Sequence, residues 1–173
     1  MRQFSISACA LICACLLFYP GCNRPSPYHN DPIPQHDELK IESKVIGETR
    51  IINVFVPPSY SSGDTKYPVL YMPDGGTKED FPHIANTLAS MIEDSKIAPL
   101  ILVGIENTNR KRDLTGNTDV KEDKELLPDF GGSPNFRDFL RNELRPVIEE
   151  RYRCNGETAI VGCLLYTSPS PRD

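Results

Sequence analysis

Three short runs of apolar residues alternate with two amphipathic segments, and this alternation constrains the fold more than any other feature of the sequence. The runs cover residues 67–72, 100–105 and 158–162, and their continuous apolarity is typical of strands buried on both faces of a sheet. Residues 81–92 and 136–152 repeat apolar side chains at spacings of three and four, which predicts one buried face on each of two helices. Alternating strands and helices predict a parallel sheet with right-handed crossovers, and therefore an α/β fold.

An antiparallel hairpin is predicted before the first of these runs. Residues 39–47 alternate apolar and polar side chains, and residues 49–56 form a second extended segment. Gly47 provides the turn between the two strands, and Pro57 and Pro58 end the second strand because proline cannot donate to a strand ladder. The predicted order is hairpin, strand, helix, strand, helix, strand.

Local signals predict how the helices begin and bend. Asp80 is expected to cap the first helix, and Ser133, followed by Pro134, is expected to cap the second. Pro146 is expected to kink the second helix because it removes a backbone hydrogen bond. Residues 107–132 are predicted to form a long polar loop, and a structureless loop of that length is either functional or disordered.

The N-terminal residues are predicted to be a targeting segment that does not belong to the fold. Arg2 precedes an almost wholly apolar run over residues 4–19. This run is shorter than the ~20 residues that span a bilayer, and it has the position of a signal peptide. We therefore expect residues 1–21 to be a signal peptide that exports the protein.

A cysteine directly after this segment is the predicted lipidation site. Gly21-Cys22 resembles the end of a bacterial lipobox, whereas Tyr19 and Pro20 depart from the small aliphatic pair that is usual there. Lipidation of Cys22 with more than one acyl chain would anchor the protein stably in a membrane of the bacterial cell envelope. A periplasmic or secreted protein is the alternative. Residues 22–38 contain several prolines without periodicity and are predicted to form a semi-rigid tether.

The last residues of the chain differ abruptly in character from what precedes them. Residues 163–173 change to a Ser/Pro string and resemble one reading frame of a sequencing-library adapter, so we expect them not to belong to the protein. Residues 39–162 are then the N-terminal part of one α/β domain, because such domains commonly run to roughly 200–250 residues. The strand at residues 158–162 would lack its later neighbours and leave an exposed apolar edge. A natural short lipoprotein is the alternative.

Charge and cysteine content exclude several classes of function. The formal net charge is −5, and the basic residues 110–112 are followed at once by Asp113, so no concentrated basic surface for nucleic acid is expected. Between Cys22 and Cys163 the chain has one cysteine, Cys154, which excludes an internal disulfide in that part. No Asp/His cluster has metal-ligand spacing and no Gly-rich phosphate loop is present, so neither a metal nor an organic cofactor is expected.

The order and spacing of several segments resemble the putative esterase family of α/β-hydrolases, which includes esterase D-like and enterochelin-esterase-like proteins. The resemblance covers residues 39–162 and depends on no single motif. It is carried by residues 54–60 (VFVPPSY), 67–76 (YPVLYMPDGG), 102–105 (LVGI), 112–115 (RDLT), 136–152 and 159–162 (AIVG). The resemblance implies an α/β-hydrolase fold and hydrolysis of a small ester by a serine nucleophile through an acyl-enzyme.

The resemblance also implies where catalytic parts belong. Gly162 matches the first glycine of the Gly-x-Ser-x-Gly elbow, and Leu164, which has no nucleophilic atom, occupies the position of the serine. The catalytic acid and histidine would follow the serine, so the chain as it stands is expected to be inactive. Gly75 and Gly76 match the loop whose backbone N–H groups help to form the oxyanion hole, with an ordinary tight turn as the alternative.

The remaining candidates are three histidines and a charged pair. His29, His36 and His83 are expected to be surface residues, because the histidine of an α/β-hydrolase triad follows the serine. Arg112 and Asp113 are expected to form a local salt bridge or a solvated loop, with a role in shaping the acyl or alcohol pocket as the alternative. A non-catalytic lipoprotein binding module on the same scaffold is the alternative function. The sequence leaves open the class of ester and the oligomeric state.

Overall fold

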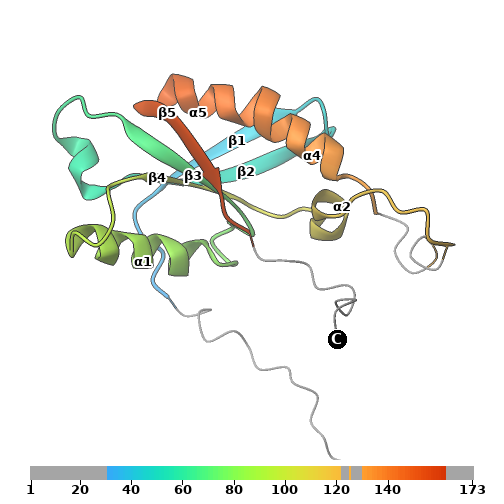
Figure 1. Cartoon of the computed structure of the whole chain (residues 1–173), viewed down its shortest axis with the longest axis horizontal. Coiled ribbons are helices and arrows are strands. Elements are labelled where there is room, and N and C mark those ends of the chain that lie inside the picture. The colour runs from blue at the N-terminus through green and yellow to red at the C-terminus, as the bar shows by residue number, and fades with distance from the viewer. Residues whose placement is uncertain (1–30, 122–124, 126–129, 163–173) are drawn as a thin grey trace, which may run out of the picture.

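The computed structural model describes residues 31–121, 125 and 130–162. The described elements are strands, α-helices, one turn of 3-10 helix (η1) and one π-helical turn (η2). In chain order they are β1 (Asp37–Ser43), β2 (Glu48–Phe55), η1 (Pro58–Ser61), β3 (Tyr67–Pro73), α1 (Phe81–Glu93), β4 (Ile101–Ile105), α2 (Arg110–Leu114), α4 (Ser133–Phe139), η2 (Leu140–Leu144), α5 (Arg145–Arg151) and β5 (Cys154–Ile160). The five strands form one sheet in the order β1-β2-β4-β3-β5, with α1 on one face and α4 to α5 on the other (Figure 1). The predicted α/β class is confirmed.

The sheet combines an antiparallel hairpin with three parallel strands. β2 pairs antiparallel with both β1 and β4, and Val54 lies opposite Val103. β3 pairs in parallel with β4 on one side and β5 on the other, so that Tyr71 lies opposite both Val103 and Ile160. Because β3, β4 and β5 run in the same direction, the residues that follow them meet at one edge of the sheet. This carboxyl edge is where ligands bind in open α/β sheets.

Apolar side chains pack against both faces of the sheet. One cluster joins the sheet to α4, η2 and α5, and a smaller cluster joins it to α1. The buried residues that the helices contribute are Phe136, Phe139, Leu144 and Ile148 on one face and Phe81 and Ala85 on the other. Burial on both faces explains why β3 and β4 are almost continuously apolar.

The predicted side-chain caps of the two helices are wrong. Asp80 is at the cap position of α1, but its side chain makes no capping hydrogen bond, and its backbone N–H donates to the Asp74 carbonyl at 3.2 Å. Ser133 is the first residue of α4, and the cap position belongs to Gly132. The Gly132 N–H donates to the Arg112 carbonyl at 2.9 Å, so contact with α2 holds the start of α4 where a side-chain cap was expected.

Pro146 follows an irregular turn within the second helix. α4 continues directly into η2 and α5, and the Arg145 N–H donates to the Leu140 carbonyl. This bond spans five residues, which is the pattern of a π-helical turn. The irregularity expected from the proline therefore takes the form of a wider turn directly before it.

Residues 31–36, which belong to the predicted tether, pack along α1. Asp31 Oδ2 lies 2.8 Å from His83 Nδ1, and the His36 ring meets the Phe81 ring edge-on with 5.3 Å between centroids. The Asp31 and His83 side chains are 33% and 31% exposed, so neither is fully solvated. The part of the tether that the structure describes is thus docked on the folded body.

Several predicted features lie outside the described residues: the signal peptide, Cys22, His29 and residues 163–173. Their assignments therefore stay predictions. Among the helices of the described residues, none has the length and apolar character needed to cross a membrane.

β5 is one of the two outer strands of the sheet in the part of the chain that the structure describes. Ile160 and Val161 are 60% and 44% exposed, although the Val161 N–H continues the parallel pairing by donating to the Tyr71 carbonyl at 2.9 Å. The apolar edge expected at residues 158–162 is therefore present.

Candidate functional site

The loop after β3 and the residues after β5 line one hollow at the carboxyl edge of the sheet. The hollow has a volume of about 470 Å³, and its lining includes Asp74 and Gly162 together with apolar side chains of β3 and α1. The chain leaves β5 at the end of the sheet where α2 lies (Figure 1). This edge contains the three glycines that the sequence singled out, Gly75, Gly76 and Gly162.

Gly75 is a position where two backbones meet. Its N–H donates to the Ile105 carbonyl at 2.9 Å, and its own carbonyl accepts from Asn53 Nδ2 at 2.8 Å. A Cβ at this position would lie 2.3 Å from Gly104 Cα, closer than a side chain tolerates. Close packing against β4 therefore accounts for this glycine.

The Gly76 N–H is held by a carboxylate of the same loop. It donates to Glu79 Oε2 at 2.7 Å, while Glu79 Oε1 accepts from Asn107 Nδ2 at 2.9 Å. A glutamate that reaches back three residues to a backbone N–H is the arrangement of a capping box. Both N–H groups predicted for the oxyanion hole thus have partners within the chain. Their role in the oxyanion hole stays a prediction. It requires the Gly76 N–H to give up its hydrogen bond to Glu79 and donate to a substrate oxygen.

Asp74, directly before the glycine pair, has a left-handed backbone with φ of 61°. Such a conformation is uncommon for a residue with a side chain, although aspartate tolerates it better than most. Arg110 of α2 binds the Asp74 carboxylate through Nε at 2.5 Å and Nη2 at 3.0 Å, and Asn107 Nδ2 adds a contact at 2.6 Å. The loop after β3 is thus joined to the segment after β4 by hydrogen bonds among Asp74, Glu79, Asn107 and Arg110.

A second charged group lies under α2, and its central residue, Arg50, was not among the candidates that the sequence indicated. Arg50 of β2 is fully buried, and its Nη2 donates to Oδ2 of Asp113, which is 2% exposed. Arg50 Nη1 also donates to the Glu106 carbonyl at 3.4 Å. The Phe136 and Phe139 rings of α4 lie 5.5 and 5.9 Å from Arg50 Cζ, so the guanidinium packs between an ion partner and aromatic faces.

The outer half of this group is partly exposed. Arg112 Nε lies 2.8 Å from Asp113 Oδ1, and Arg112 Nη2 lies 2.7 Å from Glu48 Oε1. Glu48 Oε1 is also 2.9 Å from Arg50 Nε, an ion pair without hydrogen-bond geometry, and Arg50 Nε has no hydrogen-bond partner among the described residues. The hydrogen bond from Arg112 holds the pKa of Glu48 below its ordinary value of 4.5. We call Glu48, Arg50, Arg112 and Asp113 the buried ion cluster.

The buried ion cluster shows which interpretation of Arg112 and Asp113 is correct. These residues form the local salt bridge that was expected from the sequence, and Arg50 extends it into the core. No residue of the buried ion cluster lines the hollow at Asp74 and Gly162.

Other potential catalytic groups of the described residues lie elsewhere. His83 pairs with Asp31, and His36 packs against α1. Cys154 begins β5, at the opposite end of that strand from Gly162, and burial raises the pKa of its thiol, which disfavours the reactive thiolate. Within the described residues, no three His, Cys, Asp or Glu side chains are grouped to hold a metal ion.

Comparison with known proteins agrees with this geometry. The family model described as putative esterase matches residues 43–163. Among solved structures, an IroE-like serine hydrolase from Shewanella oneidensis is 34% identical with a TM-score of 0.67, over 74% of this chain and 42% of that chain. The BES protein from Bacillus cereus is 25% identical with a TM-score of 0.62, over 75% of this chain and 52% of that one.

A curated relative, the uncharacterized protein YbbA of Bacillus subtilis (strain 168), is 28% identical over 109 residues, which are 62% of this chain and 42% of that protein. The chain spans 42% to 52% of the length of these three relatives. Since the family model covers more than half of the sequence, and the folds of the solved structures match, the chain belongs to the putative esterase family of α/β-hydrolases.

Proposed function

We propose that the complete protein is a carboxylic-ester hydrolase with a serine nucleophile that acts on a small ester. The observation that carries this proposal is the parallel pairing of β3 with β5, which brings Gly162 and Asp74 to one hollow. In α/β-hydrolases the nucleophile follows a strand on a tight turn, and oxyanion donors follow a nearby strand. The 34% identity to an IroE-like serine hydrolase supports the same reaction class.

We infer that the chain as it stands does not hydrolyse esters. Leu164 occupies the second position after Gly162, where the elbow requires the serine. The three histidines, His29, His36 and His83, all precede Gly162, whereas the triad histidine follows the serine in this fold. The inference depends on these residue identities and not on their structure.

Sequencing the source locus beyond the Gly162 codon tests the proposal. We expect the reading frame to continue as Gly-x-Ser-x-Gly with a later acidic residue and histidine, and the complete product to hydrolyse p-nitrophenyl acetate or butyrate. Replacing the elbow serine by alanine should abolish that activity. If residues 163–173 and a stop codon are encoded at the locus, the enzymatic proposal fails. A longer frame without the serine would instead favour the binding module.

We also propose that the protein is exported and anchored in the bacterial cell envelope through a lipid on Cys22. The apolar run at residues 4–19 and the Gly21-Cys22 pair support this proposal. In a bacterial host, the wild-type protein should incorporate labelled palmitate and sediment with membranes. Cys22→Ser should lose the label and enter the soluble fraction; equal labelling of both proteins would rule out this anchor.

A further inference from the structure

We propose that Arg50 and Asp113 are positioning residues for the carboxyl edge of the sheet. Their buried ion pair fixes α2, and α2 in turn holds Asp74, which begins the loop containing Gly75 and Gly76. This inference rests on the proposed ester hydrolysis, because it assigns the loop a part in that reaction.

A buried ion pair attaches α2 to the sheet. α2 has five residues, Arg110–Leu114, and a helix of that length is not stable without tertiary contacts. Asp113 is its one buried side chain, and Arg50 and Arg112 bind both carboxylate oxygens of Asp113. The fully buried anchor of this short helix is therefore an ion pair, and the partly buried Leu114 adds apolar packing against the core.

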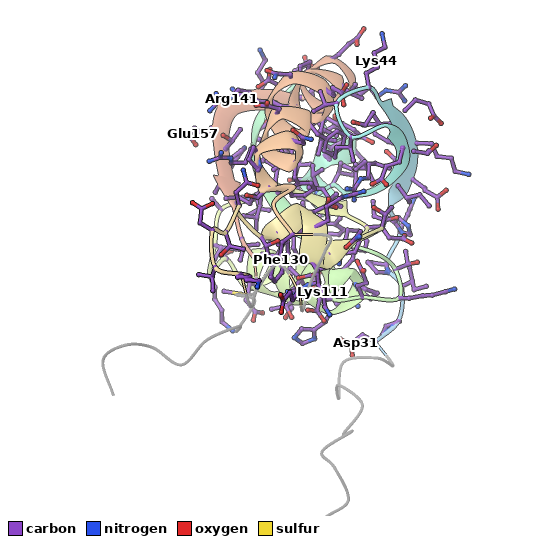
Figure 2. The ribbon with its side chains drawn as sticks, turned by 90° about the vertical axis from the view of Figure 1, so that its right-hand side faces the viewer. Asp31, Lys44, Lys111, Phe130, Arg141 and Glu157 are labelled. Atoms are coloured by element: carbon purple, nitrogen blue, oxygen red, sulfur yellow. The ribbon has the colours of Figure 1, made fainter. Side chains whose placement is uncertain are left out.

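Hydrogen bonds connect α2 to the loop after β3. Asn109 Oδ1 accepts from the Arg112 N–H at 3.1 Å, which caps α2 and fixes its first turn. Arg110, at the start of that turn, makes two hydrogen bonds to the Asp74 carboxylate. The left-handed backbone of Asp74 persists only if its surroundings hold it, and Arg110 is part of those surroundings. Figure 2 views the molecule from the side of α2, with Lys111 below α4.

The buried position beneath α2 carries two charged side chains. Replacing a buried ion pair by apolar side chains of similar volume is often neutral or stabilising, so stability alone does not explain Arg50 and Asp113. The hydrogen bonds of a planar guanidinium are directional, which lets them fix the orientation of a short helix more sharply than apolar contacts do. Orientation matters at this edge because a displacement of about 1 Å can lower a reaction rate by roughly 100-fold.

The test uses the complete protein encoded at the locus and three variants. Asp113→Asn removes the buried carboxylate charge and leaves Arg50 with the partly exposed Glu48 as its ion partner. Arg50→Met with Asp113→Leu removes both charges and fills the space with apolar groups. Ile148→Ala is the matched control, because Ile148 is fully buried in α5 near the start of β5, away from the loop. For each protein, kcat, KM, Tm and the amide resonances of glycine-labelled Gly75 and Gly76 are measured.

We expect Asp113→Asn to lower both Tm and kcat, the latter by about tenfold or more, and to shift the Gly76 amide resonance. The double variant should recover Tm but keep the low kcat and the shifted resonance. Ile148→Ala should lower Tm while kcat stays within about twofold of wild type at a temperature where the protein is folded.

Recovery of both Tm and kcat in the double variant would overturn the proposal, because the charges would then contribute no positioning. Unchanged kcat and glycine resonances in folded Asp113→Asn would overturn it as well. If Asp113→Asn does not fold, the double variant alone decides. If the wild-type protein hydrolyses no ester, the proposed function fails, and the glycine resonances still show whether the ion pair positions the loop.

Discussion

Gly104→Ala is expected to destabilise the protein, because β4 meets the Gly75 loop and α1 at this residue. A Cβ on Gly104 would lie 2.6 Å from the Gly75 carbonyl oxygen and 2.6 Å from Cδ2 of Phe81, a ring that is fully buried. Neither neighbour is the end of a flexible exposed side chain. The added methyl group therefore has to displace either a backbone or a packed aromatic ring.

The magnitude follows from two opposing effects. Overpacking a well-packed core costs about 1–3 kcal/mol, and two contacts at Gly104 that are too close for a Cβ place the cost near the upper end. Replacing glycine with alanine also restricts the unfolded chain, which stabilises the folded protein by about 0.4–1 kcal/mol. The net loss is about 2 kcal/mol, which corresponds to a fall in Tm of roughly 4–8 °C for a protein of 150–250 residues.

Thermal unfolding followed by circular dichroism at neutral pH measures this loss, and Gly116→Ala is the matched control. Gly116 has only Ser133 Oγ near its hypothetical Cβ, at 4.0 Å, so alanine fits there without displacement. We expect Gly116→Ala to leave Tm unchanged or slightly raised. If Gly104→Ala melts at or above the temperature of Gly116→Ala, the close approach of β4 to the Gly75 loop is wrong.

Three further variants test individual hydrogen bonds and titrating groups. Tyr71→Phe should remove an alkaline loss of stability. Burial raises the pKa of Tyr71 from 10.0 to about 12, so the folded wild-type protein loses stability as the pH rises between these values. The Tyr71 hydroxyl has no hydrogen-bond partner among the described residues, so Tm at pH 7 should not fall, and an unchanged alkaline profile would refute this reasoning. Glu48→Gln should flatten the acid side of the profile, because the lowered pKa of Glu48 gives stability that is present above its ordinary pKa and lost as pH falls through the folded value. The loss at pH 7 should stay below about 1 kcal/mol for a partly exposed pair, and identical acid unfolding of both proteins would contradict it. Glu79→Ala should speed hydrogen exchange at the Gly76 amide by about tenfold and leave the Gly75 amide protected, whereas equal protection of Gly76 in both proteins would show that Glu79 does not hold it.

The elements of this fold were predictable because each has a simple local pattern. The runs at residues 67–72 and 100–105 are apolar on both faces and became β3 and β4, and the three- and four-residue spacing over residues 81–92 became α1. The parallel pairing of the later strands was also predictable, since strands that alternate with helices are usually parallel neighbours. The helix starts were less predictable. Ser133 is of a residue type that often caps helices, yet the cap position of α4 is Gly132, one residue earlier, where the chain packs against Arg112.

The buried ion cluster was not predictable in full, although one signal pointed to it. Arg50 is two and four residues before Ile52 and Val54, so the period of a strand places it on their buried face. A charge at such a position indicates a buried partner. That partner, Asp113, lies 63 residues later in a short helix, and nothing in the spacing of the sequence connects the two. Tertiary pairing of this kind appears only when the sheet and α2 are placed together.

The glycine pair shows why a residue pattern alone leaves a site ambiguous. Glycine is required both where two backbones pack and where a backbone approaches a ligand, so Gly75-Gly76 fits either role. The structure separates the two residues. The N–H of Gly75 is committed to the Ile105 carbonyl, an acceptor fixed within the sheet, whereas the N–H of Gly76 is held by the side chain of Glu79, which rotation can withdraw. If this loop donates a hydrogen bond to an ester oxygen, the donor is therefore Gly76, and Gly75 serves to fix the loop against β4 so that Gly76 is presented correctly.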